Sequence, residues 1–176
     1  MATAALQRSW TGVALLSRGF RPFFLGAGLW AIAAIAIWPS FFMGEVAIPT
    51  AFSPVDWHVH EMIFGYGAAV VAGFLLTAIP NWTGRLPVAG WPLAALALLW
   101  AAGRLAIFFS APLGSLPAAV ADAAFLLVFA AVAAREGLAG RHAGNIKIVV
   151  LVLVPAAADA GFHVEAALAG SAPVAA

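Results

Sequence analysis

Cysteine is absent from the 176-residue chain, and charged residues are scarce. Without cysteine there can be no disulfide, thiolate metal ligand or cysteine nucleophile, so a metal ion would need histidine, methionine, carboxylate or backbone ligands. Only 9% of the residues are charged, against roughly 25% in soluble domains. The net charge is +1 and the basic residues are dispersed, which argues against nucleic acid as a partner.

Hydrophobic residues make up 65% of the chain, and many of them lie in long apolar runs. A helix of about 20 apolar residues crosses a hydrocarbon core about 30 Å thick. The runs are unbroken and rich in Leu, Ala, Val and Phe, unlike the short alternating strands of a membrane barrel. The sequence therefore predicts an all-α, polytopic transmembrane helical bundle in a lipid bilayer, forming a single domain followed by a flexible tail at 170–176. Its five predicted spans are Pro22–Met43, His60–Pro80, Trp91–Ser110, Pro117–Ala134 and Ile146–Leu168.

Lys and Arg predict the orientation of these spans, because they are enriched in cytoplasmic loops. Seven of the eight basic residues fall before span one, in the loops after spans two and four, or in the first turn of span five, all on one side. These residues are Arg8, Arg18, Arg21, Arg85, Arg135, Arg141 and Lys147. The N-terminus is therefore expected in the cytoplasm and the C-terminus in the periplasm.

In this topology, polar residues gather in the outer half of the membrane. Span two starts outside with His58, His60 and Glu61. His163 comes sixteen residues after Lys147, a rise of about 24 Å along a helix, which brings it to the same surface. Further ionisable residues fall in this half of the spans, namely Arg104, Asp122, Asp159 and Glu165, while His142 lies on the cytoplasmic side.

Ionisable groups inside membrane spans predict a functional site, because they are costly unless they pair or face a wet cavity. Structural roles remain open alternatives. Arg104 could form an ion pair with Asp122 or Asp159, or bind an anionic group such as a propionate. Glu61, Asp122 and Asp159 could form a second shell or a proton path. Asp159 has the spacing to orient the imidazole of His163, four residues later.

The two histidines of the HVH stretch are expected to serve different surfaces. On an ideal helix, Glu61 and Met62 share a face with His58. His60 points about 200° away, toward Ile63 and a face with aromatic and glycine positions. That environment suits a flat macrocycle at His60, and the face of His58, Glu61 and Met62 suits a small metal ion or a proton path. A histidine bonded to a neighbouring helix is the simpler alternative for each.

Small and aromatic residues are interpreted as packing features. Gly65, Ala69 and Gly73 form a stripe on which helix backbones can approach closely. The tryptophans are attributed mainly to interfacial belts and helix packing, and they include Trp30, Trp38, Trp82, Trp91 and Trp100.

Four ordered stretches resemble the NnrS family of bacterial proteins. They are SRGFRPFFL (Ser17–Leu25), WHVHEMIFGYG (Trp57–Gly67), GFLLTAIPNWTG (Gly73–Gly84) and NIKIVVLVLV (Asn145–Val154). Members of that family are inner-membrane proteins that contain haem and copper and are associated with denitrification and the response to nitric oxide. They are longer than this chain, which resembles their N-terminal half. A second copy or a partner chain would then supply the missing half.

The resemblance implies a haem, of b type, and copper. His60 and His163 are the expected haem ligands, with Arg104 near the cofactor. His58 and Met62 are the expected copper ligands, because imidazole with thioether suits copper. The resulting hypothesis is tolerance of nitric oxide and nitrosative stress, with nitric oxide as a ligand; catalysis, sensing and protection all remain open. A b-type electron-transfer cytochrome and half of a transporter or proton channel are the alternatives.

Overall fold

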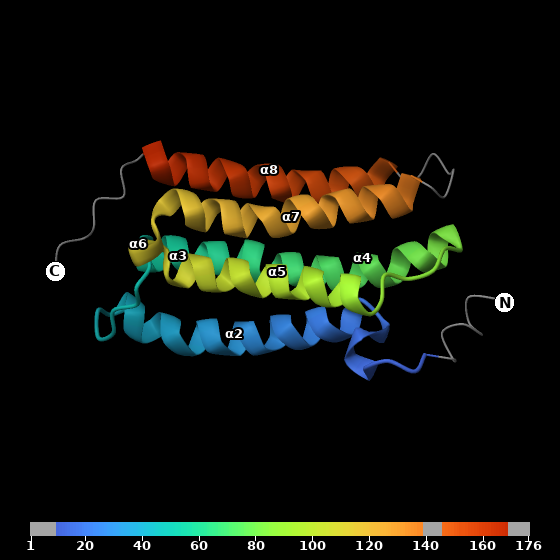
Figure 1. Ribbon diagram of the computed structural model, residues 1–176. Helices are drawn as coiled ribbons and strands as arrows, with labels where there is room; N and C mark the ends of the chain where they lie inside the picture. Colours follow the sequence, from blue (N-terminus) through green and yellow to red (C-terminus); the bar gives the residue numbers. More distant parts are fainter. Residues whose placement is uncertain (1–9, 139–145, 169–176) are drawn as a thin grey trace.

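The computed structural model describes residues 10–138 and 146–168. All regular structure in these ranges is helical (Figure 1). The elements in chain order are η1 (Ala14–Ser17), α2 (Phe20–Phe42), α3 (Pro54–His60), η2 (Glu61–Gly67), α4 (Ala68–Thr83), α5 (Trp91–Phe108), α6 (Ser110–Leu113), α7 (Ser115–Leu138) and α8 (Ile146–Leu168). Five spans within the described residues are long and apolar enough to cross a membrane, which confirms the predicted helical bundle.

The five spans run alternately up and down, so that each end of the bundle collects every second connection (Figure 1). At one end, the Gly90 amide before α5 donates to the Leu16 carbonyl in η1 at 2.8 Å. Arg85 after α4 pairs there with Glu136 of α7 at 2.6 Å. The described basic residues other than Arg104 gather at this end, as the sequence pattern predicts: Arg18 and Arg85 outside the spans, and Arg21 and Arg135 in their terminal turns. Arg8, Arg141, His142 and the tail lie outside the described residues, as does the side chain of Lys147.

The second span is one continuous helical stretch, Pro54–Thr83, built from α3, η2 and α4. It begins six residues before the expected His60, because Ser53 caps it: the hydroxyl oxygen accepts from the Asp56 amide at 3.2 Å, and Pro54 occupies the first turn. Its middle section, η2, is a π-helix. The wider turn of a π-helix changes which residues share a face.

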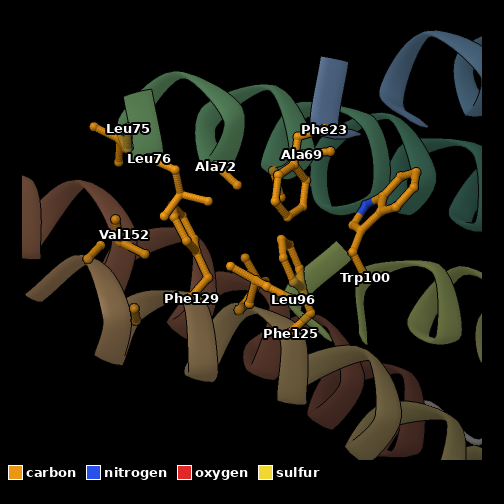
Figure 2. Close-up of a cluster of buried hydrophobic side chains, with 14 of the residues drawn as sticks. Phe23, Ala69, Ala72, Leu75, Leu76, Leu96, Trp100, Phe125, Phe129 and Val152 are labelled. Carbon is orange, nitrogen blue, oxygen red and sulfur yellow. The ribbon is translucent and has the colours of Figure 1, made fainter. Parts of the chain in front are cut away.

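A hydrophobic core fills the space between α2, α4, α5, α7 and α8 (Figure 2). On α4, Ala69 and Ala72 are fully buried, and their small side chains let neighbouring helices come close. Phe125 and Phe129 of α7 stack with ring centroids 6.0 Å apart, and Phe23 of α2 lies 5.8 Å from Phe125. The second span is the central one, with half of its most apolar window buried, whereas α2 and α8 lie at the outside.

We expect Gly73→Ala to loosen the contact between α2 and α4. A Cβ at this position would lie 2.8 Å from the Phe24 ring and 3.1 Å from the Phe23 Cβ. Overpacking of this kind costs about 1–3 kcal/mol. Gly28→Ala on α2 is the matched control, because nothing lies within 4 Å of its Cβ position. Unfolding of the detergent-solubilised variants measures the difference; equal stability of the two would contradict this account of the packing.

Candidate metal centre

A buried polar network lies toward the end of the bundle opposite the Arg85–Glu136 pair, and all five spans contribute to it. Its charged members are almost completely buried, with Glu61 and Asp159 at 0%, Asp122 at 1% and Arg104 at 2% exposure. Each must find its partners inside the protein, because the membrane interior offers none. The members are Trp30 of α2, His60 of α3, Glu61 of η2, Arg104 of α5, Asp122 of α7, and Asp159 and His163 of α8.

Arg104 holds one half of the network together. Its guanidinium donates to Glu61 Oε2 at 2.9 Å and forms a second ion pair with Asp122. The indole of Trp30 donates to the same Glu61 oxygen at 2.6 Å. A planar guanidinium can serve two carboxylates on different helices at once. This half therefore connects α2, η2, α5 and α7 through charge-assisted hydrogen bonds.

His60 lies at the centre, with carboxylates at both ring nitrogens. Nδ1 is 3.3 Å from Glu61 Oε1, and Nε2 is 2.9 Å from Asp122 Oδ2 and 3.2 Å from Asp159 Oδ1. Aromatic rings enclose the imidazole: Phe52 stacks on it at 6.0 Å, and Phe162 lies 5.0 Å away between centroids. The imidazole is thus fixed in position and shielded from water.

His163 completes the second half of the network. Its Nε2 is 3.1 Å from Asp122 Oδ2 and 3.7 Å from Asp159 Oδ1. One carboxylate oxygen of each aspartate therefore lies between the two imidazoles. Among the described residues, one potential ligand atom from each of four side chains forms a group within 4.8 Å, namely from His60, Asp122, Asp159 and His163.

The buried charges do not balance by themselves. Three carboxylates face one guanidinium, so two negative charges remain when both imidazoles are neutral. Uncompensated charge in a low-dielectric interior is strongly unfavourable. The second oxygen of Asp159, Oδ2, has no hydrogen-bond partner among the described residues. Two protons or one divalent cation would neutralise the network.

Two glycines leave the space that the network needs. A Cβ on Gly65 would lie 2.6 Å from Glu61 Oε2 and 2.7 Å from the Arg104 guanidinium. A Cβ on Gly103 would lie 3.1 Å from Asp122 Oδ1. The carbonyl of Gly65 accepts a hydrogen bond from the Trp100 indole at 2.9 Å. Thus the small residues serve the polar site as well as the helix contacts.

Comparison with known proteins assigns the sequence to a family. It matches the NnrS protein family over residues 14–176. The chain belongs to the NnrS family. No curated protein and no solved structure matches it.

In this NnrS-family chain, the predicted separation of His60 from Glu61 is wrong. Both side chains are fully buried and 3.3 Å apart, whereas Ile63, expected beside His60, is 54% exposed. The ideal-helix argument fails because η2 begins at Glu61 and a π-helix advances each residue by a smaller angle than an α-helix. Phe64 does share the side of His60, with ring centroids 5.2 Å apart.

The other two predicted ligands, His58 and Met62, have aromatic and apolar neighbours. The His58 ring stacks on Trp38 with centroids 4.2 Å apart. Met62 packs against the apolar cluster that contains Trp57 and Ile107. His58 does not belong to the four-residue group found among the described histidines and carboxylates. Arg104 pairs with Asp122, one of the two partners considered from the sequence, and with Glu61.

Sequence reasoning missed the role of two tryptophans. The sequence pattern predicts interfacial belting and packing for Trp30 and Trp100, yet each indole donates a hydrogen bond inside the bundle. Both fall about ten residues into their spans, away from the interfaces. A buried indole N–H needs an acceptor, so their depth in the sequence was the available signal.

We expect Arg104→Met to destabilise the protein strongly, because it leaves Glu61 and Asp122 buried without their cation. Breaking a buried pair in this way costs about 3–5 kcal/mol. Arg85→Met removes the 41%-exposed partner of Glu136, and an exposed pair contributes about 0–1 kcal/mol. Unfolding in detergent compares the two variants; a loss at Arg104 no larger than that at Arg85 would contradict the pairing.

Proposed function

We propose that this chain is a multi-pass protein of the bacterial inner membrane that binds a divalent transition-metal ion, copper, and contributes to tolerance of nitric oxide. The observation that carries the proposal is the group of four ligand atoms within 4.8 Å on four buried or nearly buried side chains. Membership of the NnrS family supports copper binding and a role in nitrosative stress, because members of that family contain haem and copper and are associated with the response to nitric oxide.

The distances suit a small ion after a slight contraction. The four edges that join the imidazole nitrogens to the carboxylate oxygens measure 2.9, 3.2, 3.1 and 3.7 Å. Nitrogen and oxygen ligands lie about 2.0–2.2 Å from a zinc-like ion, so opposite ligands are separated by at most about 4.4 Å. A contraction of about half an ångström from the 4.8 Å limit would then bring all four atoms into range.

The chemistry of the ligands supports a divalent ion. Two imidazole nitrogens and two carboxylate oxygens suit Cu(II) and similar ions, whereas Cu(I) prefers softer sulfur ligands. A divalent cation would also neutralise the two excess negative charges of the network. Glu61 would act behind the ion by holding His60 through Nδ1, 3.3 Å away, the arrangement that fixes an imidazole for binding through its other nitrogen. A bound copper ion would supply ligand binding and one-electron chemistry.

A haem held between His60 and His163 does not fit this arrangement. Axial ligands approach the iron from opposite faces of the macrocycle. Here the Asp122 carboxylate oxygen lies within 2.9 Å and 3.1 Å of the two Nε2 atoms, and the ring centroids are only 5.3 Å apart. The space between the imidazoles is therefore occupied by protein atoms. No part of the proposed function depends on haem in this position.

We expect the purified chain to bind about one copper ion per molecule, and Asp159→Asn and His163→Ala to lose it, since each removes a ligand. His58→Ala is the control and should retain copper, because His58 lies outside the four-residue group. Metal analysis after equilibrium dialysis, with the electron paramagnetic resonance spectrum of Cu(II), measures both. Loss of copper in His58→Ala, together with retention of copper in Asp159→Asn, would place the copper site at His58 instead. A haem absorption band abolished by His60→Ala would overturn the fit argument.

The cellular role has its own test. In a bacterium that lacks its homologue, we expect the parent chain and His58→Ala to restore growth under a nitric-oxide donor, and Asp159→Asn to fail at equal membrane abundance. Rescue by Asp159→Asn as complete as that of the parent would separate the metal centre from nitrosative-stress tolerance.

A further inference from the structure

Three side chains of the four-residue group are buried, and the fourth is partly exposed. The side chains of His60, Asp122 and Asp159 are at most 1% exposed, whereas that of His163 is 9% exposed. The approach is therefore at His163, at the last turns of α8. The His163 imidazole is therefore the member of the group that a molecule from outside meets first.

A cavity of about 340 Å³ lies at this position, between the first turns of α7 and the last turns of α8. Its walls are mostly small and apolar, including Ala119, Ala123, Ala160 and Val164, with His163 at one point. No Asp, Glu, Lys or Arg lines it among the described residues. Phe52 borders the cavity and also stacks on His60, so the cavity reaches the wall of the polar network.

The exposed residues that line the cavity are mostly apolar, with Ser115 as a polar one among them. Leu116, Val120 and Val164 line it and are 73%, 61% and 58% exposed. Exposed apolar side chains of this kind on transmembrane helices are compatible with the lipid interior. The opening is thus suited to molecules dissolved in the membrane, and a charged molecule would lose its hydration without gaining an ionic partner on the way.

We propose that this cavity is a lateral entrance by which small, uncharged, lipid-soluble molecules reach His163 and the group behind it. The proposal rests on the proposed function for what the molecule meets there, a metal ion, but the route itself depends only on the cavity and on His163. The lining thereby selects by charge and size before any metal chemistry takes place.

The test uses diethyl pyrocarbonate, a small neutral reagent that acylates imidazole nitrogen, on the metal-free, detergent-purified chain. Mass spectrometry follows modification of each histidine-containing peptide over time. We expect His163 to react and the fully buried His60 to remain protected. Ala123→Phe and Ala160→Phe, which fill the cavity from opposite walls, should slow modification of His163 several-fold. Val128→Phe, on the exposed face of α7 and outside the cavity lining, should leave the rate unchanged.

The outcomes test the proposed entrance separately from the proposed metal centre. An unreactive His163 in the parent, or equal rates in both filling variants and the parent, overturns the proposal. Circular dichroism and unfolding curves identify a variant that is misfolded, and the second filling variant then decides. Copper analysis of the same samples tests the proposed function independently. If the chain binds no copper but cavity filling still slows the modification of His163, the proposed entrance stands and the proposed metal centre is wrong.

Discussion

The burial of charge inside a membrane bundle is the constraint on which the rest of the structure depends. Glu61, Asp122 and Asp159 are removed from water and from lipid headgroups, so each has to be paired within the protein. Arg104 serves two of them, and His60 and His163 lie against the aspartates. Because the partners come from different helices, satisfying the charges also fixes how the helices are arranged relative to one another.

The local backbone is adapted to this network. The junction of α3 with the π-helix η2 lies between His60 and Glu61, and both side chains enter the network there, 3.3 Å apart. Gly65 leaves room for the Glu61 carboxylate and the Arg104 guanidinium, and the Trp100 indole satisfies the Gly65 carbonyl. Helix packing and the polar site therefore use the same small residues, and a change in one affects the other.

The network has two unlike halves. Around Arg104, the carboxylates are paired with fixed donors, including Trp30, and that half is suited to holding helices. Around His163, one oxygen of Asp159 lacks a hydrogen-bond partner among the described residues, and an apolar cavity lies alongside. Excess negative charge, nitrogen and oxygen ligands and access for neutral molecules thus coincide at one point, which is why the proposed chemistry is assigned there.

The sequence by itself determined the five helical spans, their alternating direction and the convergence of His60 with His163, because span length, apolar composition and helical rise are local properties. It also indicated an ion pair of Arg104 with either Asp122 or Asp159, since buried opposite charges pair, and the structure shows the pair with Asp122. Only the tertiary structure decided that Glu61 lies beside His60, that Trp30 bonds to a carboxylate, and that His58 stacks on Trp38 outside the four-residue group. Those outcomes depend on the π-helical register and on which faces of separate helices meet, and no single segment of the sequence specifies either.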